Sequence, residues 1–171
     1  MLENLDASLE GKVIIFSGGS GYLGSAMVEH LLACGVTLIN LGRNEPDVIS
    51  KYPERGEHYN VDFYDTDKLT KTLTAVVDEL GHVDVLVNNS FDFSSETGFN
   101  DPSGRLEILK KDTFLKAMES GIYWPLLCSQ IVGRQMIDQG NGNIINITSL
   151  YSNLVADYRI YFPYRGIRAS G

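Results

Sequence analysis

The chain has 171 residues, of which 43% are hydrophobic, and its formal net charge is −8 at pH 7. This length and composition suit a single domain, residues 1–171, with a sizeable core, and they exclude a disordered chain. Because binding to nucleic acid or to an anionic membrane needs clustered lysine and arginine, the acidic balance excludes both as favoured partners.

The sequence carries no sign of export or of a metal centre. No stretch reaches the roughly twenty apolar residues of a membrane span, and residues 1–11 lack the basic start and apolar run of a signal peptide. We therefore expect a cytoplasmic protein. Cys34 and Cys128 lie in apolar helical surroundings and are expected to be core residues rather than a disulfide. The three histidines share no ligand spacing, so no metal site is expected.

The first predicted strand, Val13–Ser17, leads into a glycine-rich turn and then into a helix. Glycines let the backbone turn tightly against a pyrophosphate, and a helix N-terminus offers N–H groups and the positive end of its dipole. Glycines also serve in plain turns, but the strand before and the helix after favour the phosphate interpretation. The residues expected to contact a dinucleotide here are Gly18, Ser20, Gly21, Tyr22, Leu23 and Gly24.

The remaining predicted elements alternate between strand and helix. The further strands are Thr37–Leu41, His58–Asp62, Val83–Asn88 and Asn143–Thr148. The helices are Tyr22–Cys34, Thr66–Leu80 and residues 111–138, with room for one short helix in residues 44–57. Gly35 and Gly81 are the expected stops of the first two helices. This alternation is typical of a parallel sheet that is covered on both faces.

We expect an α/β fold, a doubly wound parallel sheet of the Rossmann type with three layers and the strand order 3-2-1-4-5. In this order a cofactor crosses the carboxyl edge of the sheet between the first and fourth strands. Only about twenty residues follow the fifth predicted strand, fewer than a complete domain of this type uses. The sequence therefore predicts one dinucleotide-binding domain that is truncated after its fifth strand.

The residues after the second strand indicate which dinucleotide is bound. An acidic residue at this corner accepts a hydrogen bond from the 2′-hydroxyl of NAD and repels the 2′-phosphate of NADP. The corner reads Asn40-Leu41-Gly42-Arg43-Asn44 and contains no acid. Arg43 can donate charge-assisted hydrogen bonds to a 2′-phosphate, although an ordinary solvated arginine is the alternative. We expect NADP as the cofactor, with NAD as the alternative.

Four motifs in order resemble the short-chain dehydrogenase/reductase family, in a classical-like form. They are Ser17 to Gly24, Val61-Asp62, Asn88-Asn89-Ser90 and Ile144 to Ser149. The glycine spacing alone is closer to the extended, epimerase-like branch, and residues 142–161 are similar to members that act in flagellin modification and sugar biosynthesis. The resemblance covers nearly the whole chain and implies hydride transfer between a nicotinamide and a small-molecule carbonyl or alcohol substrate.

The resemblance also implies roles for three residues at strand ends. Asp62 is expected to meet the adenine amino group, or else to cap the next helix. Asn88 and Asn89 are expected to tie neighbouring strand ends together and to border the cofactor. The family usually continues with Ala-Gly where this chain has Ser90-Phe91, and this bulk is expected to alter the packing around the nicotinamide ribose.

A serine and a tyrosine carry the catalysis that the resemblance implies. Ser149 follows the fifth strand and is expected to hold the substrate oxygen, with a simple turn serine as the alternative. No Tyr-x-x-x-Lys pattern follows the fifth predicted strand, where the family carries it. The nearest form there joins Tyr164 to Arg168, whose cation lies four residues later. Tyr158 and Tyr161 are competitors, all three tyrosines could instead be packing residues, or the true pair belongs to a longer parent chain.

Another departure lies in the long predicted helix. Gly121 occupies the place where the family commonly has a relay asparagine, and Pro125 cannot donate to the Gly121 carbonyl. This carbonyl is expected to be free at a kink, where it holds a relay water or simply fits the packing. The departures keep a second function open, a dinucleotide-binding domain without turnover or an inactive fragment, and a sugar-nucleotide epimerase is less favoured.

Two further segments have more than one interpretation. Residues 90–105 carry three phenylalanines among polar residues, and they are expected either to border a substrate pocket or to form a surface loop. Residues 111–138 are expected to offer a face for a homo-oligomer, or else to pack only on the sheet.

Overall fold

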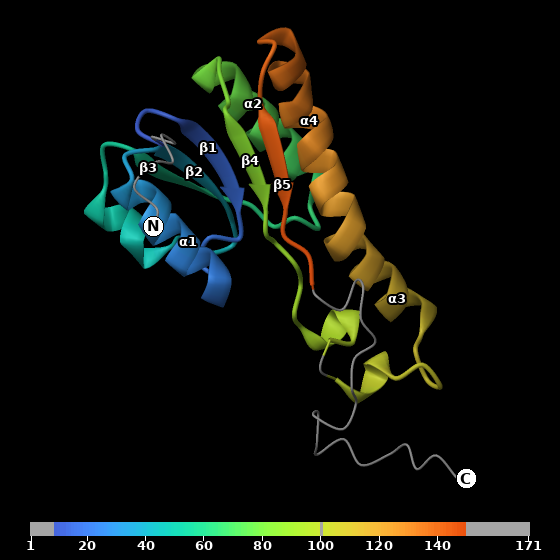
Figure 1. Cartoon of the computed structure of the whole chain (residues 1–171). Coiled ribbons are helices and arrows are strands. Elements are labelled where there is room, and N and C mark those ends of the chain that lie inside the picture. Colours follow the sequence, from blue (N-terminus) through green and yellow to red (C-terminus); the bar gives the residue numbers. More distant parts are fainter. Residues whose placement is uncertain (1–8, 100, 150–171) are drawn as a thin grey trace, which may run out of the picture.

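The computed structural model describes residues 9–99 and 101–149, which form a five-stranded parallel sheet with helices on both faces (Figure 1). The strands are β1 (Val13–Ser17), β2 (Thr37–Gly42), β3 (Gly56–Asn60), β4 (Val85–Asn88) and β5 (Asn143–Asn146). They lie in the order β3-β2-β1-β4-β5, and every neighbouring pair is parallel. The predicted fold class and strand order are confirmed.

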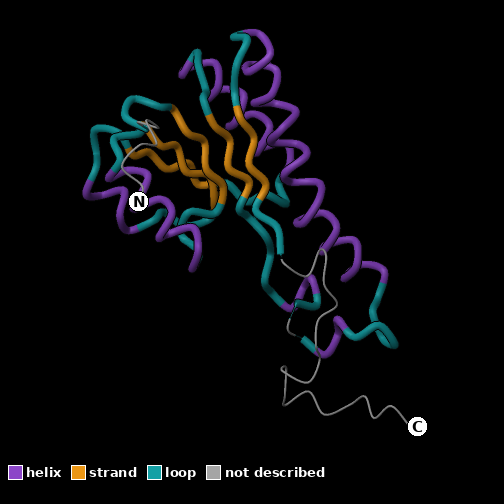
Figure 2. The backbone as a smooth tube through the Cα atoms, in the orientation of Figure 1, coloured by secondary structure: helices purple, strands orange, loops and turns teal. Residues whose placement is uncertain are grey.

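Figure 2 shows the sheet between its helical layers. The α-helices are α1 (Tyr22–Ala33), α2 (Thr66–Leu80), α3 (Lys111–Met118) and α4 (Trp124–Asp138). The short 3-10 helices are η1 (Asp47–Lys51), η2 (Ser95–Thr97) and η3 (Pro102–Gly104), and a π-helical turn, η4 (Glu119–Tyr123), joins α3 to α4. The short helix predicted between the second and third strands is η1.

Two hydrophobic clusters hold these layers together. On one face of the sheet, Phe16 of β1 packs with Val28 of α1 and Ile49 of η1. On the other face, Ile15 of β1 packs with residues of α2 and α4, among them Leu73. The chain therefore leaves β1 toward one face and leaves β4 toward the other, although these strands are neighbours. Their carboxyl ends form the topological switch point at which open α/β sheets bind ligands.

The predicted bounds of β1 and α2 match the structure, and the other bounds differ by one or two residues. β3 lies two residues earlier than predicted at both ends. Its pairing with β2 begins at Gly56 and Glu57 and ends at Asn60. Asp62 therefore lies in the loop before α2 rather than at a strand end. The strand pairing of β4 begins at Val85 instead of Val83, and that of β5 ends at Asn146 instead of Thr148.

The helix predicted over residues 111–138 is interrupted where Gly121 and Pro125 indicated a kink. Pro125 has no N–H for the carbonyl of Gly121, and the preceding N–H, that of Trp124, donates to the Glu119 carbonyl five residues back. The interruption is a π-helical turn that divides the segment into α3 and α4.

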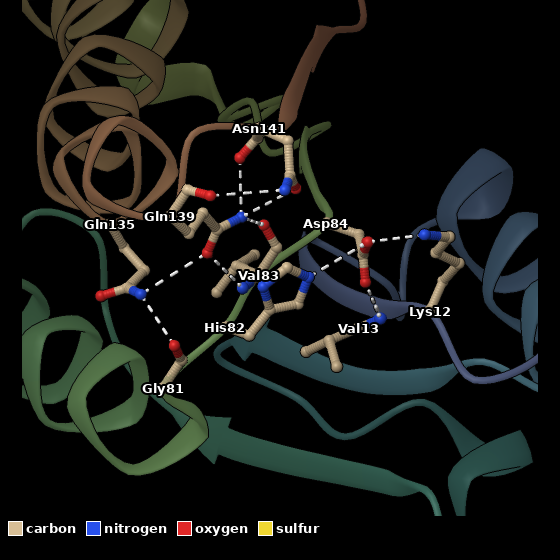
Figure 3. Close-up of polar contacts among 9 residues, drawn as sticks. All are labelled: Lys12, Val13, Gly81, His82, Val83, Asp84, Gln135, Gln139 and Asn141. Carbon is tan, nitrogen blue, oxygen red and sulfur yellow. Dashed lines mark hydrogen bonds and ion pairs between the residues drawn. The ribbon is translucent and has the colours of Figure 1, made fainter.

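Polar side chains fasten the amino ends of β1 and β4 on the side opposite the switch point (Figure 3). Asp84 accepts hydrogen bonds from Lys12 Nζ at 2.8 Å and from the Val13 N–H at 2.9 Å. Gln139, which follows α4, donates to the Val83 carbonyl at 2.7 Å and accepts from the Val83 N–H at 3.2 Å. The loop before β4 is thus held by β1 on one side and by α4 on the other.

Asp84 makes the stability of this edge depend on pH. Burial alone would raise the pKa of Asp84, but hydrogen bonds from Lys12, Val13 and His82 outweigh it and lower the pKa to about 2. A carboxyl group with a depressed folded-state pKa stabilises the fold above its unfolded pKa of about 3.9, and this stability is lost as the pH falls toward 2.

Asp84→Asn is therefore expected to lower the free energy of unfolding by about 1–2 kcal/mol at pH 7. Urea unfolding of wild type and variant should show this difference, and the difference should narrow between pH 5 and pH 3. Lys51→Ala is the control, since its ion pair with Glu29 joins two exposed side chains at 3.6 Å. An unchanged difference at pH 3 would contradict the assignment.

The cysteines behave as packing residues. Cys128 is buried and free, and burial raises the pKa of its thiol to about 12. Cys34 is half-buried and also forms no disulfide.

No helix in the described ranges is both long enough and apolar enough to cross a bilayer. Residues 9–99 and 101–149 also hold no group of three or more potential metal ligands.

Candidate cofactor-binding site

The glycine turn after β1 forms the centre of the candidate site. Gly18 has φ = +76°, a left-handed conformation that a side chain would strain. Its N–H donates to the Leu41 carbonyl of β2 at 2.9 Å, and its carbonyl accepts from the Gly21 N–H at 3.3 Å. These bonds turn the chain sharply from the end of β1 toward the start of α1.

The glycines of this turn differ in what a side chain would meet. A Cβ at Gly24 would collide with the Gly18 carbonyl, a Cβ at Gly19 would collide with Asn40, and a Cβ at Gly18 would lie 2.9 Å from Ser90 Oγ. A Cβ at Gly21 would meet only the Gly18 carbonyl, at an ordinary 3.5 Å. The fold itself needs three of the four glycines, whereas Gly21 leaves open space beside the helix N-terminus.

The N-terminus of α1 is suited to an anion. Gly21 is the N-cap and supplies no side-chain hydrogen bond, and the first turn contains no acidic residue. The first N–H groups of a helix have no partner within the helix, and the helix dipole favours negative charge there. Tyr22 and Leu23 point their side chains to solvent, 95% and 56% exposed, so these two side chains do not fold over the backbone donors.

Ser17, which the sequence analysis did not assign as a site residue, joins the turn to β4. Its buried hydroxyl oxygen accepts hydrogen bonds from the N–H groups of Asn89 and Ser90, both at 3.0 Å. Asn89 Nδ2 in turn donates to the Gly18 carbonyl at 3.1 Å. A serine as the last residue of a buried apolar strand is the signal that points to such a contact. Together these bonds fix the carboxyl ends of β1 and β4 against each other.

Asn88 ties β4 to the other side of the sheet. Its Nδ2 donates to Asn146 Oδ1 of β5 at 2.9 Å and to Ser129 Oγ of α4 at 3.2 Å. Its buried Oδ1 has no partner among the described residues. The prediction that Asn88 and Asn89 join neighbouring strand ends is confirmed, with Asn88 facing β5 and Asn89 facing the glycine turn.

Arg43 and Asp62 lie on the same edge, beyond β2 and β3. Arg43 follows the last residue of β2, its side chain is exposed, and its carbonyl accepts from Asn60 Nδ2 at 2.7 Å. Asp62 Oδ1 accepts from the Tyr64 N–H at 3.0 Å, within the loop before α2. The alternative that Asp62 caps α2 is wrong, because the N-cap is Asp65, which accepts from the Lys68 N–H.

Asp92, in the loop after β4, is joined by a hydrogen bond to the loop that precedes α2. It is buried and accepts a 2.8 Å hydrogen bond from the hydroxyl of Tyr64. Burial works to raise the pKa of Asp92, but bonds from Ser94 and Tyr64 and the charge of Arg43 lower it. Burial and the bond to Asp92 raise the pKa of Tyr64. The hydroxyl of Tyr64 therefore donates its hydrogen bond to an ionised Asp92, and the positive charge of Arg43 helps to keep Asp92 ionised.

Phe91 shows how the chain accommodates its departures from the family pattern. A Cβ at Gly121 would lie 3.4 Å from the Phe91 ring, so the ring packs over this glycine of the π-helical turn. Phe91, Phe93 and Phe99 pack edge to face, with centroids 4.7–5.9 Å apart. The segment after β4 is therefore an aromatic cluster that begins beside the glycine turn.

The predicted catalytic residues are only partly within the described chain. Ser149 lies three residues after β5, on the carboxyl side of the sheet, and is exposed. Tyr164 and Arg168, like Tyr158 and Tyr161, lie outside the described residues. The structure thus brings together the glycine turn, Arg43, Asp62 and Asn89 at one edge, and their contacts with a cofactor stay predictions.

Comparison with known proteins agrees with this geometry. The family model described as short chain dehydrogenase matches residues 12–161. A 2-dehydro-3-deoxy-D-gluconate 5-dehydrogenase from Escherichia coli (strain K12) is 32% identical over 150 residues, covering 85% of this chain and 56% of the relative. The chain thus spans a little over half the length of this relative.

Two solved structures show the same fold. A short-chain dehydrogenase from Streptomyces avermitilis has a TM-score of 0.73 and 26% identity, covering 89% of this chain and 55% of that one. A metagenomic short-chain oxidoreductase in complex with NADP has a TM-score of 0.72 and 25% identity, covering 86% of this chain and 66% of that one. With the strand order and the glycine turn, these matches show that the chain belongs to the short-chain dehydrogenase family.

Proposed function

We propose that this chain binds a nicotinamide dinucleotide, NADP in preference to NAD, and serves hydride transfer between the nicotinamide and a carbonyl or alcohol carbon. The observation that carries the proposal is the open space at Gly21 beside the uncapped N-terminus of α1. A pyrophosphate fits this space because it can take the free N–H groups as donors. When bound, the cofactor supplies the hydride acceptor or donor.

The residues of the chain would divide the binding between them. The backbone of residues 18–24 holds the pyrophosphate, Arg43 pairs with the 2′-phosphate, and Asp62 meets the adenine. Asn89 keeps the glycine turn in register with β4, as its bond to the Gly18 carbonyl supports. The solved relative in complex with NADP supports the proposed cofactor class.

Arg43→Ala is expected to weaken NADPH binding by about 1.5–3 kcal/mol, because a charge-assisted hydrogen bond to the 2′-phosphate is lost. NADH binding should change little. Fluorescence titration of both dinucleotides gives the comparison, and Arg55→Ala is a matched control because Arg55 pairs with Glu54 away from the glycine turn. Equal affinity of the wild type for both dinucleotides, or an unchanged preference in Arg43→Ala, would contradict the role.

The proposed proton chemistry rests on Ser149 and Tyr164. Ser149 holds the substrate oxygen and Tyr164 transfers the proton. The cation of Arg168 lowers the pKa of the Tyr164 phenol, as this proton transfer requires. Because no lysine lies four residues after a tyrosine in the part of the chain that follows β5, and because position 121 is glycine, we expect the 171-residue chain to turn over weakly or not at all.

NADPH consumption with a panel of small ketones and aldehydes tests this function. General acid–base catalysis contributes about 100- to 10,000-fold, so Ser149→Ala and Tyr164→Phe should each remove most of any rate observed. Tyr123→Phe, on the π-helical turn, is the control tyrosine. Binding of NADPH without turnover would instead favour a dinucleotide-binding domain that does not catalyse. The expectations of a cytoplasmic location and of pairing through residues 111–138 stay predictions.

A further inference from the structure

A buried polar chain connects the glycine turn to the outer strand of the sheet. Asn40 of β2 is fully buried, and its Oδ1 accepts a 2.8 Å hydrogen bond from the N–H of Gly19. On its other side, Asn40 Nδ2 lies 2.9 Å from Nδ1 of His58 on β3. Three neighbouring segments of the carboxyl half of the sheet are therefore joined through one side chain.

The backbone fixes the direction of both hydrogen bonds. The Gly19 N–H can only donate, so the atom of Asn40 that faces it must be the oxygen. The Asn40 amide nitrogen then faces His58, and it too can only donate. His58 Nδ1 must accept, which requires a neutral imidazole that carries its hydrogen on Nε2.

A proton on His58 Nδ1 would turn this contact into two donors that face each other. If the Asn40 amide turned over, its oxygen would satisfy His58, but its nitrogen would then face the Gly19 N–H. In either orientation one hydrogen bond of Asn40 is lost, and the fully buried amide is not exposed to bulk solvent that could replace it. An unpaired buried donor is costly, and at Gly19 the cost falls on the turn beside Gly21.

We propose that Asn40 and His58 are positioning residues that hold the glycine turn in its binding conformation, and that protonation of His58 weakens dinucleotide binding. The proposal rests on the proposed function, because it assigns these residues to the same cofactor site. Histidine is the side chain whose charge ordinarily changes between pH 5 and 8. The chain then binds its cofactor less tightly in mildly acidic solution.

Several titratable groups lie on the elements that surround His58. His58 pairs in register with Asn40, on the sheet face that α1 and η1 cover. The titratable groups on α1, on η1 and on the loop from β2 to η1, apart from the solvent-exposed Tyr22 at the start of α1, are Glu29, His30, Arg43, Glu45, Asp47 and Lys51. Cys34 and Tyr52 follow α1 and η1 directly. Lys51 is paired with Glu29, and His58 takes part in no ion pair among the described residues. On β3 itself, Glu57 and Tyr59 flank His58 in the sequence.

Calorimetric titration of the 171-residue chain with NADP⁺ at pH 8.0 and pH 5.5 tests the proposal. The affinity of the wild type is expected to fall about five- to tenfold more between these pH values than that of His58→Gln. Glutamine can present an oxygen to Asn40 without titrating, and the 2′-phosphate of NADP⁺ titrates equally in both experiments. His82→Gln, at the amino end of the sheet, should keep the pH dependence of the wild type.

Asn40→Asp provides a second variant, in which the group that faces His58 accepts a hydrogen bond instead of donating one. A carboxylate accepts from the Gly19 N–H and from a protonated His58, so the acid-induced loss of affinity should disappear. Equal losses in wild type and His58→Gln would overturn the proposal.

A readout without cofactor separates this proposal from the proposed function. Imidazole ¹⁵N spectra at pH 8 should show His58 in the form with hydrogen on Nε2. A hydrogen on Nδ1 at pH 8 would overturn the positioning role whether or not NADP⁺ binds. Failure of the wild type to bind NADP⁺ at pH 8, with the expected spectrum, would overturn the dinucleotide site and the effect on binding, but not the hydrogen-bonded chain.

Discussion

Gly21→Val is expected to reduce dinucleotide affinity by at least about a hundredfold while the chain keeps its fold. The backbone at Gly21, with φ = −72° and ψ = 168°, is extended and suits any residue. The protein offers a side chain open space there, so the conflict arises only with a phosphate that lies against the N-terminus of α1. Calorimetric titration with NADP⁺ and circular dichroism at rising temperature measure the two effects separately.

Two alanine variants provide the controls for this result. Gly133→Ala, on α4, places its methyl group 3.9 Å from Ile144 and should leave both binding and melting unchanged. Gly24→Ala should instead lower the melting temperature, because its methyl group collides with the Gly18 carbonyl. Full binding by Gly21→Val would place the dinucleotide elsewhere on the chain.

Ser17→Ala is expected to lower the free energy of unfolding by about 2–4 kcal/mol. The variant removes one oxygen but leaves two donors, the N–H groups of Asn89 and Ser90, without their partner at the end of β1. Because Ser17 is 2% exposed, water cannot readily replace the hydroxyl. Urea unfolding followed by circular dichroism gives the change.

Ser25→Ala is the matched control for this variant. The Ser25 hydroxyl bonds only to the nearby Tyr22 carbonyl on the exposed side of α1, and its loss should change stability by less than about 0.5 kcal/mol. Ser17→Thr keeps the oxygen and should recover most of the lost stability. A Ser17→Ala protein as stable as the wild type would show that the two N–H groups find other partners.

The sequence predicts the architecture well because its signals are local and repeated. β1 is an apolar strand that is followed directly by glycines, and α2 runs from the Asp65 cap to Gly81, whose φ of 64° stops the helix. Where these local signals are weak, the predicted bounds of an element differ from the observed ones. β3 contains polar residues and Gly56, and its bounds follow from pairing with β2 rather than from its own composition.

The contacts within the site depend on pairs of residues that are far apart in the sequence. Asn40 gives no sign by itself that it faces Gly19 and His58, because that depends on the register of three segments. In the same way, Phe91 and Gly121 each depart from the family pattern, and only the fold shows that the ring of one lies over the backbone of the other. Motif analysis finds the glycine turn and Asn89, but it does not find Ser17 and Asn40, which also support the turn.

The parallel sheet also has a consequence for the rate at which the chain folds. Neighbouring parallel strands cannot be joined by a hairpin. Each pair can therefore form only after the long connection between the two strands has folded back. The bond from the Asn89 N–H to Ser17 joins residues 72 positions apart, at the carboxyl ends of the middle strand β1 and its neighbour β4. Chains dominated by such distant contacts fold slowly. Until β1 meets β4, the unpaired backbone N–H and C=O groups along the facing edges of both strands are exposed to other chains. The contact that shapes the candidate cofactor site is therefore also a point at which aggregation competes with folding.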